Sequence, residues 1–235
     1  MIYMVADTET TDATPERGVC EIGWIVIDEN WNILEQVESL IDPQKPISPA
    51  ASGIHGLTNE DVQDSPTLHE FFTEPSCYGR NFHGPVTLIG HRIGFDRPAF
   101  EPYVNGEVFE LDTLRFARFC YPEADNHQLS TLKYALGLPK DQGTAHRVLA
   151  DVMVTYHLAK HLAERMGMSL PELAERAKTP LPAHSLPFGK HRGEPLAQVP
   201  KSYLRWALSN TQMDEDFVVA IKQVLGLNHE SGTDR

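Results

Sequence analysis

Short apolar runs in a particular order are the feature that most limits how this chain can fold. Three runs near the N-terminus have the composition of strands and follow one another with turn residues between them, which predicts an antiparallel meander. Later runs alternate with helical segments, as they do in α/β proteins. The expected strands are 2–6, 19–27, 32–41, 86–91 and 108–111, and the expected helices are 65–72, 95–103, 129–136 and 147–166. We therefore predict an α/β fold.

The last of these helices carries its apolar residues on one side. Val148, Val152, Ala159 and Leu162 recur at helical spacing and mark the face that packs on the sheet. Asp151 borders this face, where a carboxylate is costly unless another group compensates its charge. This position is the first indication of a functional site.

The overall charge argues against simple nucleic-acid binding. The chain has 20 Lys and Arg against 33 Asp and Glu, a net charge of −13, whereas nucleic-acid binding usually relies on a basic excess. A local basic segment or bound metal ions would have to correct this balance. The apolar fraction of 41% supports a packed core and excludes the disordered and fibrous classes.

The cysteines and the N-terminal segment favour a reducing, intracellular location. Cys20, Cys77 and Cys120 are scattered and form no CxxC pair, which argues against a disulfide framework and a structural zinc site. No cationic segment precedes Asp7, so we read no export signal. No apolar stretch near it approaches the ~20 residues of a membrane span. We expect a cytoplasmic protein that does not span a membrane.

Two carboxylates stand where the first expected strand ends. Asp7 and Glu9 are two residues apart, so both side chains project to the same face of the strand. Adjacent carboxylates repel each other, and a hard divalent cation such as Mg²⁺ relieves this repulsion. An isolated Asp-x-Glu is also common as a solvated acidic turn, so the pair proves little by itself.

Three further residues extend the pattern. Asp96 follows the fourth expected strand at a helix start, where the helix dipole already favours an acidic residue. His146 and Asp151 form a His-x4-Asp motif that opens the long helix. Each motif alone is expected by chance, but their order and context indicate a single site.

In these motifs the chain resembles the DEDDh 3′→5′ exonucleases, a family related to the proofreading subunit of bacterial DNA polymerase III. The matching segments are 7–10, 54–58, 95–96 and 146–151, within about residues 2–166. The resemblance implies a ribonuclease H-like mixed five-stranded sheet flanked by helices, with a small C-terminal accessory region. The segment 187–206 looks most like the accessory region of the exonuclease X branch.

The resemblance also implies a reaction and its residues. Asp7, Glu9, Asp96 and Asp151 would hold two Mg²⁺ ions, for which Mn²⁺ can substitute, and His146 would be the general base. Two ions about 3.5–4 Å apart suit phosphodiester hydrolysis because they serve both the attacking and the leaving oxygen. The implied enzyme releases nucleoside 5′-monophosphates from the 3′ end of DNA. An RNA-directed member of the family, oligoribonuclease-like or RNA-trimming, is the alternative, and a non-catalytic nucleic-acid-binding module is the less favoured one.

Four residues in or near the matching motifs are expected to contact substrate. Thr8 and Phe95 flank the acidic residues, and His55 lies in a loop expected against the terminal nucleotide, although it also fits a simple turn histidine. Arg92 stands where many family members have Asn, and its guanidinium is suited to gripping a phosphate.

A pair of histidines in the long helix is a second possible metal site. His157 and His161 lie four residues apart on one helix face, the spacing of a zinc-binding pair. No Glu occupies the HExxH positions, so surface histidines are the favoured interpretation.

The C-terminal region differs in charge from the rest of the chain. Segment 184–205 has four basic residues against Glu194 alone. Lys190 and Arg192 supply positive charge, and Tyr203 and Trp206, nearby in sequence, supply aromatic surface for stacking. This combination predicts a region that binds nucleic acid. The alternative is a hairpin and helix that stabilise the main domain, with Trp206 in a core. We expect an exonuclease domain at 1–178, a proline-rich linker at 179–185, an accessory region at 186–226 and a disordered tail at 227–235.

Overall fold

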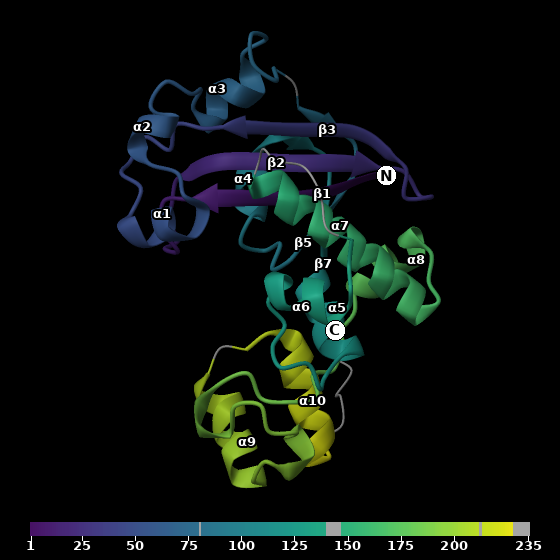
Figure 1. Cartoon of the computed structure of the whole chain (residues 1–235). Coiled ribbons are helices and arrows are strands. Elements are labelled where there is room, and N and C mark those ends of the chain that lie inside the picture. The colour runs from purple at the N-terminus through teal and green to yellow at the C-terminus, as the bar shows by residue number, and fades with distance from the viewer. Residues whose placement is uncertain (80, 140–146, 212, 228–235) are drawn as a thin grey trace, which may run out of the picture. The chain divides into compact units, whose positions relative to one another are not determined.

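A computed structural model describes residues 1–79, 81–139, 147–211 and 213–227 (Figure 1). The chain divides into two compact units. The first unit consists of Met1–Leu114 and Gln128–Lys178, and the second of Arg115–His127 and Thr179–Arg235. In the described parts of the chain, no helix combines the length and the apolar character that a bilayer crossing requires.

A five-stranded sheet in the order β3-β2-β1-β5-β7 forms the centre of the first unit. The strands are β1 (Ile2–Thr10), β2 (Val19–Ile27), β3 (Ile33–Leu40), β5 (Val86–Gly90) and β7 (Val108–Asp112). The pairs β1–β2 and β2–β3 are antiparallel, whereas β1–β5 and β5–β7 are parallel. The expected meander and the mixed five-stranded sheet flanked by helices are confirmed.

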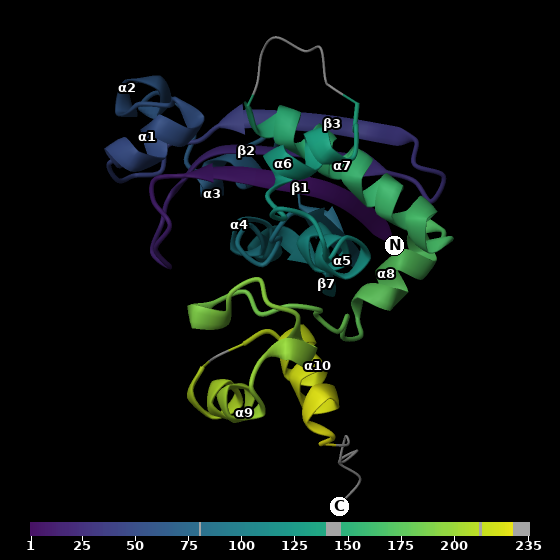
Figure 2. The same cartoon turned by 60° about the horizontal axis from the view of Figure 1, so that its bottom comes forward.

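One face of this sheet is covered by α7 (Arg147–Met166), which packs across β1, β2 and β5 (Figure 2). Gly23 of β2 permits this close approach: a Cβ atom at Gly23 would lie 2.7 Å from Cγ1 of Val148. Gly23 is also the register partner of Asp7 on β1. The start of α7 therefore lies beside the acidic end of β1.

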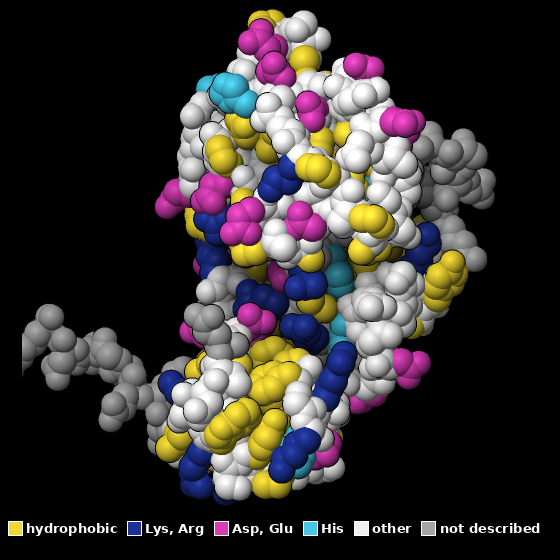
Figure 3. All heavy atoms as spheres, turned by 90° about the vertical axis from the view of Figure 1, so that its left-hand side faces the viewer, with side chains coloured by type: hydrophobic (Ala, Val, Ile, Leu, Met, Phe, Trp, Pro, Cys, Tyr) yellow, Lys and Arg dark blue, Asp and Glu magenta, His cyan; other side chains and the backbone are white. Residues whose placement is uncertain are grey.

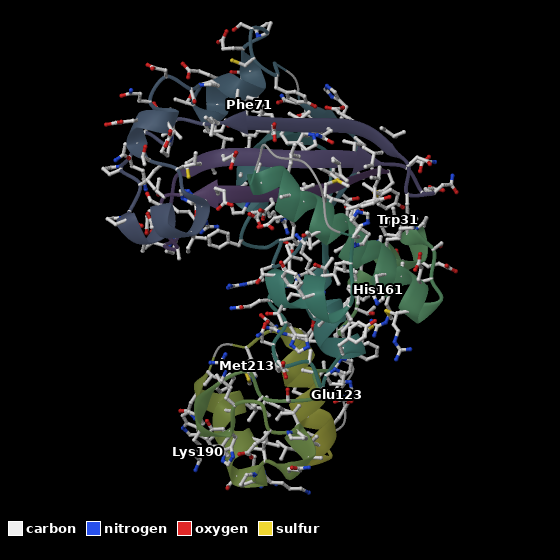
Figure 4. The ribbon with its side chains drawn as sticks, in the orientation of Figure 1. Trp31, Phe71, Glu123, His161, Lys190 and Met213 are labelled. Atoms are coloured by element: carbon white, nitrogen blue, oxygen red, sulfur yellow. The ribbon has the colours of Figure 1, made fainter. Side chains whose placement is uncertain are left out.

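The opposite face carries an aromatic core around Trp24, which is fully buried. Its ring stacks on Phe72 at a centroid distance of 5.9 Å and meets Phe71, which is labelled in Figure 4, and Phe100 edge-on at 6.0 Å. These rings come from α3 (Leu68–Thr73) and α4 (Arg97–Phe100), and Phe82 joins them from β4 (Phe82–His83), which pairs with β6 (Val104–Asn105). This packing fixes the position of α4 and therefore of Asp96, the residue at its N-cap.

Several helices differ from the sequence expectation. The helix expected from residue 65 begins at Leu68, because Thr67 and Glu70 form a capping box there. The helix expected at 95–103 is α4 followed by a 3₁₀ turn, Glu101–Tyr103. The remaining helices of the first unit are α1 (Pro49–His55), α2 (Asn59–Val62), α6 (Leu129–Ala135) and α8 (Leu170–Ala177), and α5 (Thr113–Cys120) runs from the first unit into the second.

The second unit has a small core of its own. It contains 3₁₀ turns at Gly189–His191 and Leu196–Gln198, followed by α9 (Lys201–Asn210) and α10 (Glu215–Leu225). The core residues are Leu186, Leu196, Val199, Leu204, Ala220, Ile221 and Leu225.

A segment distant in sequence also belongs to this second unit. Arg115 donates from Nε and Nη2 to the two carboxylate oxygens of Asp216, at 2.8 Å each, and from Nη2 to the carbonyl oxygen of Thr179 at 3.1 Å. Residues 115–127, which the sequence suggested for the exonuclease domain, are therefore grouped with the C-terminal region.

Candidate active site

Three carboxylates meet between the end of β1 and the first turns of α7. Asp7 and Glu9 lie on the β1 face that is turned to α7, because Met4 and Ala6 occupy the opposite face in the aromatic core. Asp7, Glu9 and Asp151 each offer one oxygen atom, and these atoms all lie within 4.8 Å of one another. Asp7 and Glu9 are partly buried and Asp151 is exposed, so the group is open to solvent.

Asp96 lies at the N-cap of α4 and is 4% exposed. Its Oδ1 accepts hydrogen bonds from the backbone N–H of Thr8 at 3.1 Å and from the Thr8 hydroxyl at 2.6 Å. These bonds join residues 88 positions apart and attach the start of α4 to β1. Asp96 is thereby brought near Asp7, whose pKa its charge affects.

The charged forms of Asp7, Asp96 and Asp151 are unfavourable in this site. Burial, followed by the charges of Asp96, Asp151 and Glu9, holds the pKa of Asp7 well above its ordinary value. Burial raises the pKa of Asp96 to about 7, although hydrogen bonds from Thr8 act in the opposite direction. Burial also raises the pKa of Asp151. A group that brought positive charge would therefore be bound favourably here.

The donor set fits a hard divalent cation. All the converging side chains are carboxylates, the ligands that Mg²⁺ and Mn²⁺ prefer, and no described His or Cys belongs to the group. Partial exposure leaves room for water molecules, which Mg²⁺ usually retains among its ligands.

The fifth expected catalytic residue, His146, lies outside the described residues. The helix α7 begins at the next residue, Arg147, and Asp151 stands in its second turn. The assignment of His146 as a general base stays a prediction.

Two expected substrate contacts have structural roles. Thr8 is 8% exposed, and its hydroxyl is used to hold Asp96. His55 is 3% exposed: its Nδ1 accepts from the backbone N–H of Leu57 at 3.0 Å, and its Nε2 lies 3.3 Å from the carbonyl oxygen of Thr10. The ring of His55 is enclosed and joins the end of α1 to the end of β1, and its expected contact with a nucleotide stays a prediction.

Phe95 is accompanied by a residue that sequence reasoning missed. The guanidinium of Arg17, from the β1–β2 loop, lies 3.6 Å from the centre of the Phe95 ring and donates a hydrogen bond to the Phe95 carbonyl oxygen. The charge of Arg17 also lowers the pKa of the neighbouring Asp96. An isolated Arg in a polar loop gives no sequence signal for this role, because its partners lie 78 residues away.

Arg92 has an unusual backbone conformation. Its φ of +72° lies in the left-handed region, which favours Gly and Asn over residues with long side chains. Asp112 stabilises the turn, because its Oδ1 accepts from the backbone N–H groups of Arg92 and Leu114 at 2.9 Å each. The Arg92 side chain is exposed, which is compatible with the expected phosphate contact.

Lys133 of α6 is a second missed residue. Its positive charge partly offsets the raised pKa of Asp151, which places it in the electrostatic environment of the site. Sequence spacing did not single it out, because α6 and α7 are separated in sequence by residues 136–146 and come together through packing. The remaining expected contacts, Lys190 and Arg192, belong to the second unit.

Comparison with known proteins agrees with this geometry. Residues 4–159 match the RNase_T family model, described as exonuclease, and residues 177–228 match a second model that is named for a quorum-sensing-regulated virulence factor. Exodeoxyribonuclease 10 of Escherichia coli (strain K12) is 28% identical over 228 residues, which cover 94% of this chain and 97% of that protein.

Two further relatives add to the comparison. The PolC-type DNA polymerase III of Pediococcus pentosaceus is 31% identical over 180 residues, which cover 71% of this chain and 12% of the polymerase. A solved structure of exonuclease X in complex with 5′ overhanging duplex DNA superposes with a TM-score of 0.60 at 24% identity, covering 74% of this chain and 99% of that one. The last comparison shows a shared fold.

Proposed function

The chain belongs to the exonuclease family that its residues 4–159 match, and from this membership we propose that it is a metal-dependent 3′→5′ exonuclease acting on DNA. Hydrolysis of the terminal phosphodiester bond would release nucleoside 5′-monophosphates. The observation that carries the proposal is the convergence of Asp7, Glu9 and Asp151 within 4.8 Å, beside a buried Asp96.

The metal requirement follows from the cost of this convergence. The raised pKa values of Asp7 and Asp96 mean that burial disfavours their charged forms, and for Asp7 the charges of the neighbouring carboxylates add to this cost. We assign Asp7, Glu9, Asp96 and Asp151 as the ligands of two Mg²⁺ ions, which Mn²⁺ can replace. When bound, such ions activate water at neutral pH and stabilise the charge that develops on the phosphate and leaving oxygens.

The chain itself contributes positions and a proton acceptor. Thr8 holds Asp96 against β1 through two hydrogen bonds, and Gly23 lets α7 bring Asp151 to the same place. His146 is assigned as the general base that accepts a proton from the attacking water, a role that histidine commonly has near neutral pH. Exposed Arg92 binds a phosphate of the substrate strand.

DNA is the proposed substrate because the relative that covers nearly the whole chain is named an exodeoxyribonuclease. Since the carboxylate set is common to DNA- and RNA-directed members of the resembled family, the choice of polymer has to be measured. A protein that binds nucleic acid without cleaving it is the remaining alternative.

The test is a degradation assay on end-labelled DNA and RNA, single- and double-stranded, with Mg²⁺ and with EDTA. We expect 5′-labelled DNA to shorten one nucleotide at a time, with nucleoside 5′-monophosphates as products and no reaction in EDTA. Asp7→Asn and His146→Ala should each abolish this turnover. Glu164→Gln, an exposed acid near the far end of α7, is the matched control and should retain it.

The outcomes separate the alternatives. Faster degradation of RNA than of matched DNA would transfer the assignment to an exoribonuclease. Stable DNA binding without turnover in either Mg²⁺ or Mn²⁺ would identify a binding module. Full activity of Asp7→Asn would contradict the metal site itself.

A further inference from the structure

The second unit carries an unusual surface cluster that takes no part in the carboxylate site. We call it the loop–helix patch and define it as Lys190, His191 and Arg192 of one loop with Tyr203, Arg205 and Trp206 of α9. Figure 3 shows Lys and Arg side chains beside hydrophobic ones on the surface of the second unit, and Figure 4 labels Lys190 in this unit.

The loop of this patch is held in one conformation. Gly189 and Gly193 have φ values of +70° and +82°, which favour glycine, and a Cβ at Gly189 would lie 2.2 Å from the hydroxyl oxygen of Tyr203. The backbone N–H groups of Arg192 and Gly193 donate to the carbonyl oxygens of Gly189 and Leu186 at 3.1 and 2.8 Å. The loop is therefore pressed onto α9, and its cations are presented at fixed positions.

The aromatic rings of the patch form a continuous series. The His191 ring lies 4.6 Å from the Tyr203 ring, and the Tyr203 ring lies 5.2 Å from that of Trp206. Lys190 Nζ lies 5.4 Å from the centre of the Tyr203 ring, within the range of a cation–π contact.

Trp206 ends this series and is 48% exposed. The sequence alternative that placed Trp206 in a core is wrong, because Leu204 and Ala207 take the buried positions of α9. A purely structural tryptophan would be covered, whereas this indole keeps much of its surface available to a partner.

The charges of the patch are of one sign. Glu194, its acidic neighbour, is paired with His191 Nδ1 at 2.8 Å. Within the described part of the chain, no ion pair involves Lys190, Arg192 or Arg205. These exposed cations stand out in a chain with a net charge of −13.

We propose that the loop–helix patch is a binding site for single-stranded nucleic acid, with a base stacked on Trp206 and the adjacent phosphates held by Lys190 and Arg192. Exposed aromatic faces next to cations are the combination that binds single strands without reading their sequence. Paired bases in a duplex offer no free face to Trp206, so a single strand is the fitting ligand. The choice of DNA as the strand rests on the proposed function.

Binding is measured with the full-length protein in EDTA, where cleavage does not interfere. Fluorescein-labelled single-stranded DNA of 20 thymidines is titrated by anisotropy, with a duplex of equal length as the comparison. We expect Trp206→Ala to weaken single-strand binding by about 5- to 150-fold, the range for loss of one base–aromatic stack. We expect the K190Q/R192Q double variant to lower the slope of log affinity against log salt by about 1.4, since each phosphate contact contributes about 0.7 for single strands.

Control variants separate the binding role from a folding role. Arg165→Gln removes one charge from an exposed position on α7 and should change the affinity and the salt slope little. Trp206→Phe keeps a stacking ring and should retain most of the affinity, whereas Trp206→Leu fills space without stacking and should lose it. Single-stranded DNA should also quench the fluorescence of the wild type more than that of Trp206→Phe.

Equal affinity of wild type, Trp206→Leu and the K190Q/R192Q variant would overturn the proposal. Equal loss in Trp206→Phe and Trp206→Leu, with a lowered melting temperature for both, would also overturn it, because the ring would then be structural. Since this assay needs no turnover, its result is independent of whether the degradation assay supports the proposed exonuclease.

Discussion

Replacing Gly23 by alanine tests whether the contact between α7 and β2 sets the active site. The new Cβ would lie 2.7 Å from Cγ1 of Val148 and 3.2 Å from its Cγ2, whereas ordinary contact begins at 3.4 Å. Val148 is fully buried, and its β-branched side chain has one strongly preferred rotamer in a helix, so it cannot turn away easily. We expect the first turns of α7 to retreat by about 0.7 Å or more from β2.

The size of the effect follows from this displacement. Overpacking of this kind costs about 1–3 kcal/mol of the free energy of unfolding. Asp151 moves with α7 while Asp7, opposite Gly23, stays on β1. Because a misplacement of about 1 Å can cost about 100-fold in rate, we expect Gly23→Ala to lower kcat by about 10- to 100-fold and to raise the Mg²⁺ concentration needed for half-maximal activity.

The assay is single-turnover cleavage of 5′-labelled single-stranded DNA over a range of Mg²⁺ concentrations. Gly53→Ala is the matched control, because a Cβ at Gly53 meets no atom within 4 Å, and it should retain full activity. Adding Val148→Ala to Gly23→Ala removes the clashing methyl groups and should restore much of the lost rate. Wild-type kcat and Mg²⁺ dependence in Gly23→Ala, or no recovery in the double variant, would refute the reasoning.

Three further results are expected. Mg²⁺ or Mn²⁺ at about 100 times its dissociation constant should raise the free energy of unfolding by about 2.7 kcal/mol, and Asp7→Asn should abolish this gain in a thermal melt. In EDTA, Asp96→Asn should be more stable than wild type by up to about 4 kcal/mol above pH 7 and no more stable below pH 4. The reason is that the pKa of Asp96 in the folded protein, about 7, exceeds the ordinary value of 3.8. Ionisation of Asp96 therefore destabilises the wild-type fold as the pH rises, and Asn does not ionise. Chemical denaturation across pH would show no such divergence if Asp96 were already well compensated. Asp216→Ala should cost about 3–5 kcal/mol, since it leaves the Arg115 guanidinium without its bidentate partner, and equal stability in calorimetry would contradict this.

The sequence predicted the elements with strong periodicity and clear ends. The strand expected at 19–27 and the helix expected at 147–166 have those bounds in the structure, and the latter ends before Gly167, which has a φ of +65°. The helix α5 was missed because it follows β7 directly, with no turn residue to mark its start. The start of α3 was misplaced because Thr67 competes successfully with Ser65 as the cap.

The site was predictable in its acidic residues and not in the groups that position them. Asp7 and Glu9 could be paired from strand alternation alone, which needs no tertiary information. The hydrogen bonds of Thr8 to Asp96 and the stacking of Arg17 on Phe95 join residues far apart in sequence, so spacing along the chain does not reveal them. Burial of His55 depends in the same way on packing.

The second unit is assembled from two stretches that are separated in sequence by residues 128–178. During synthesis, Arg115 leaves the ribosome about a hundred residues before Asp216, so α6, α7 and α8 are made before the carboxylate that binds this guanidinium is available. A truncated product that ends at Lys178 would retain Arg115 but lack Asp216 and Thr179, which accept hydrogen bonds from its guanidinium. Removing the C-terminal region by a cut in the proline-rich segment is thus not a neutral operation, and its effects on nuclease activity would mix lost binding with a damaged scaffold.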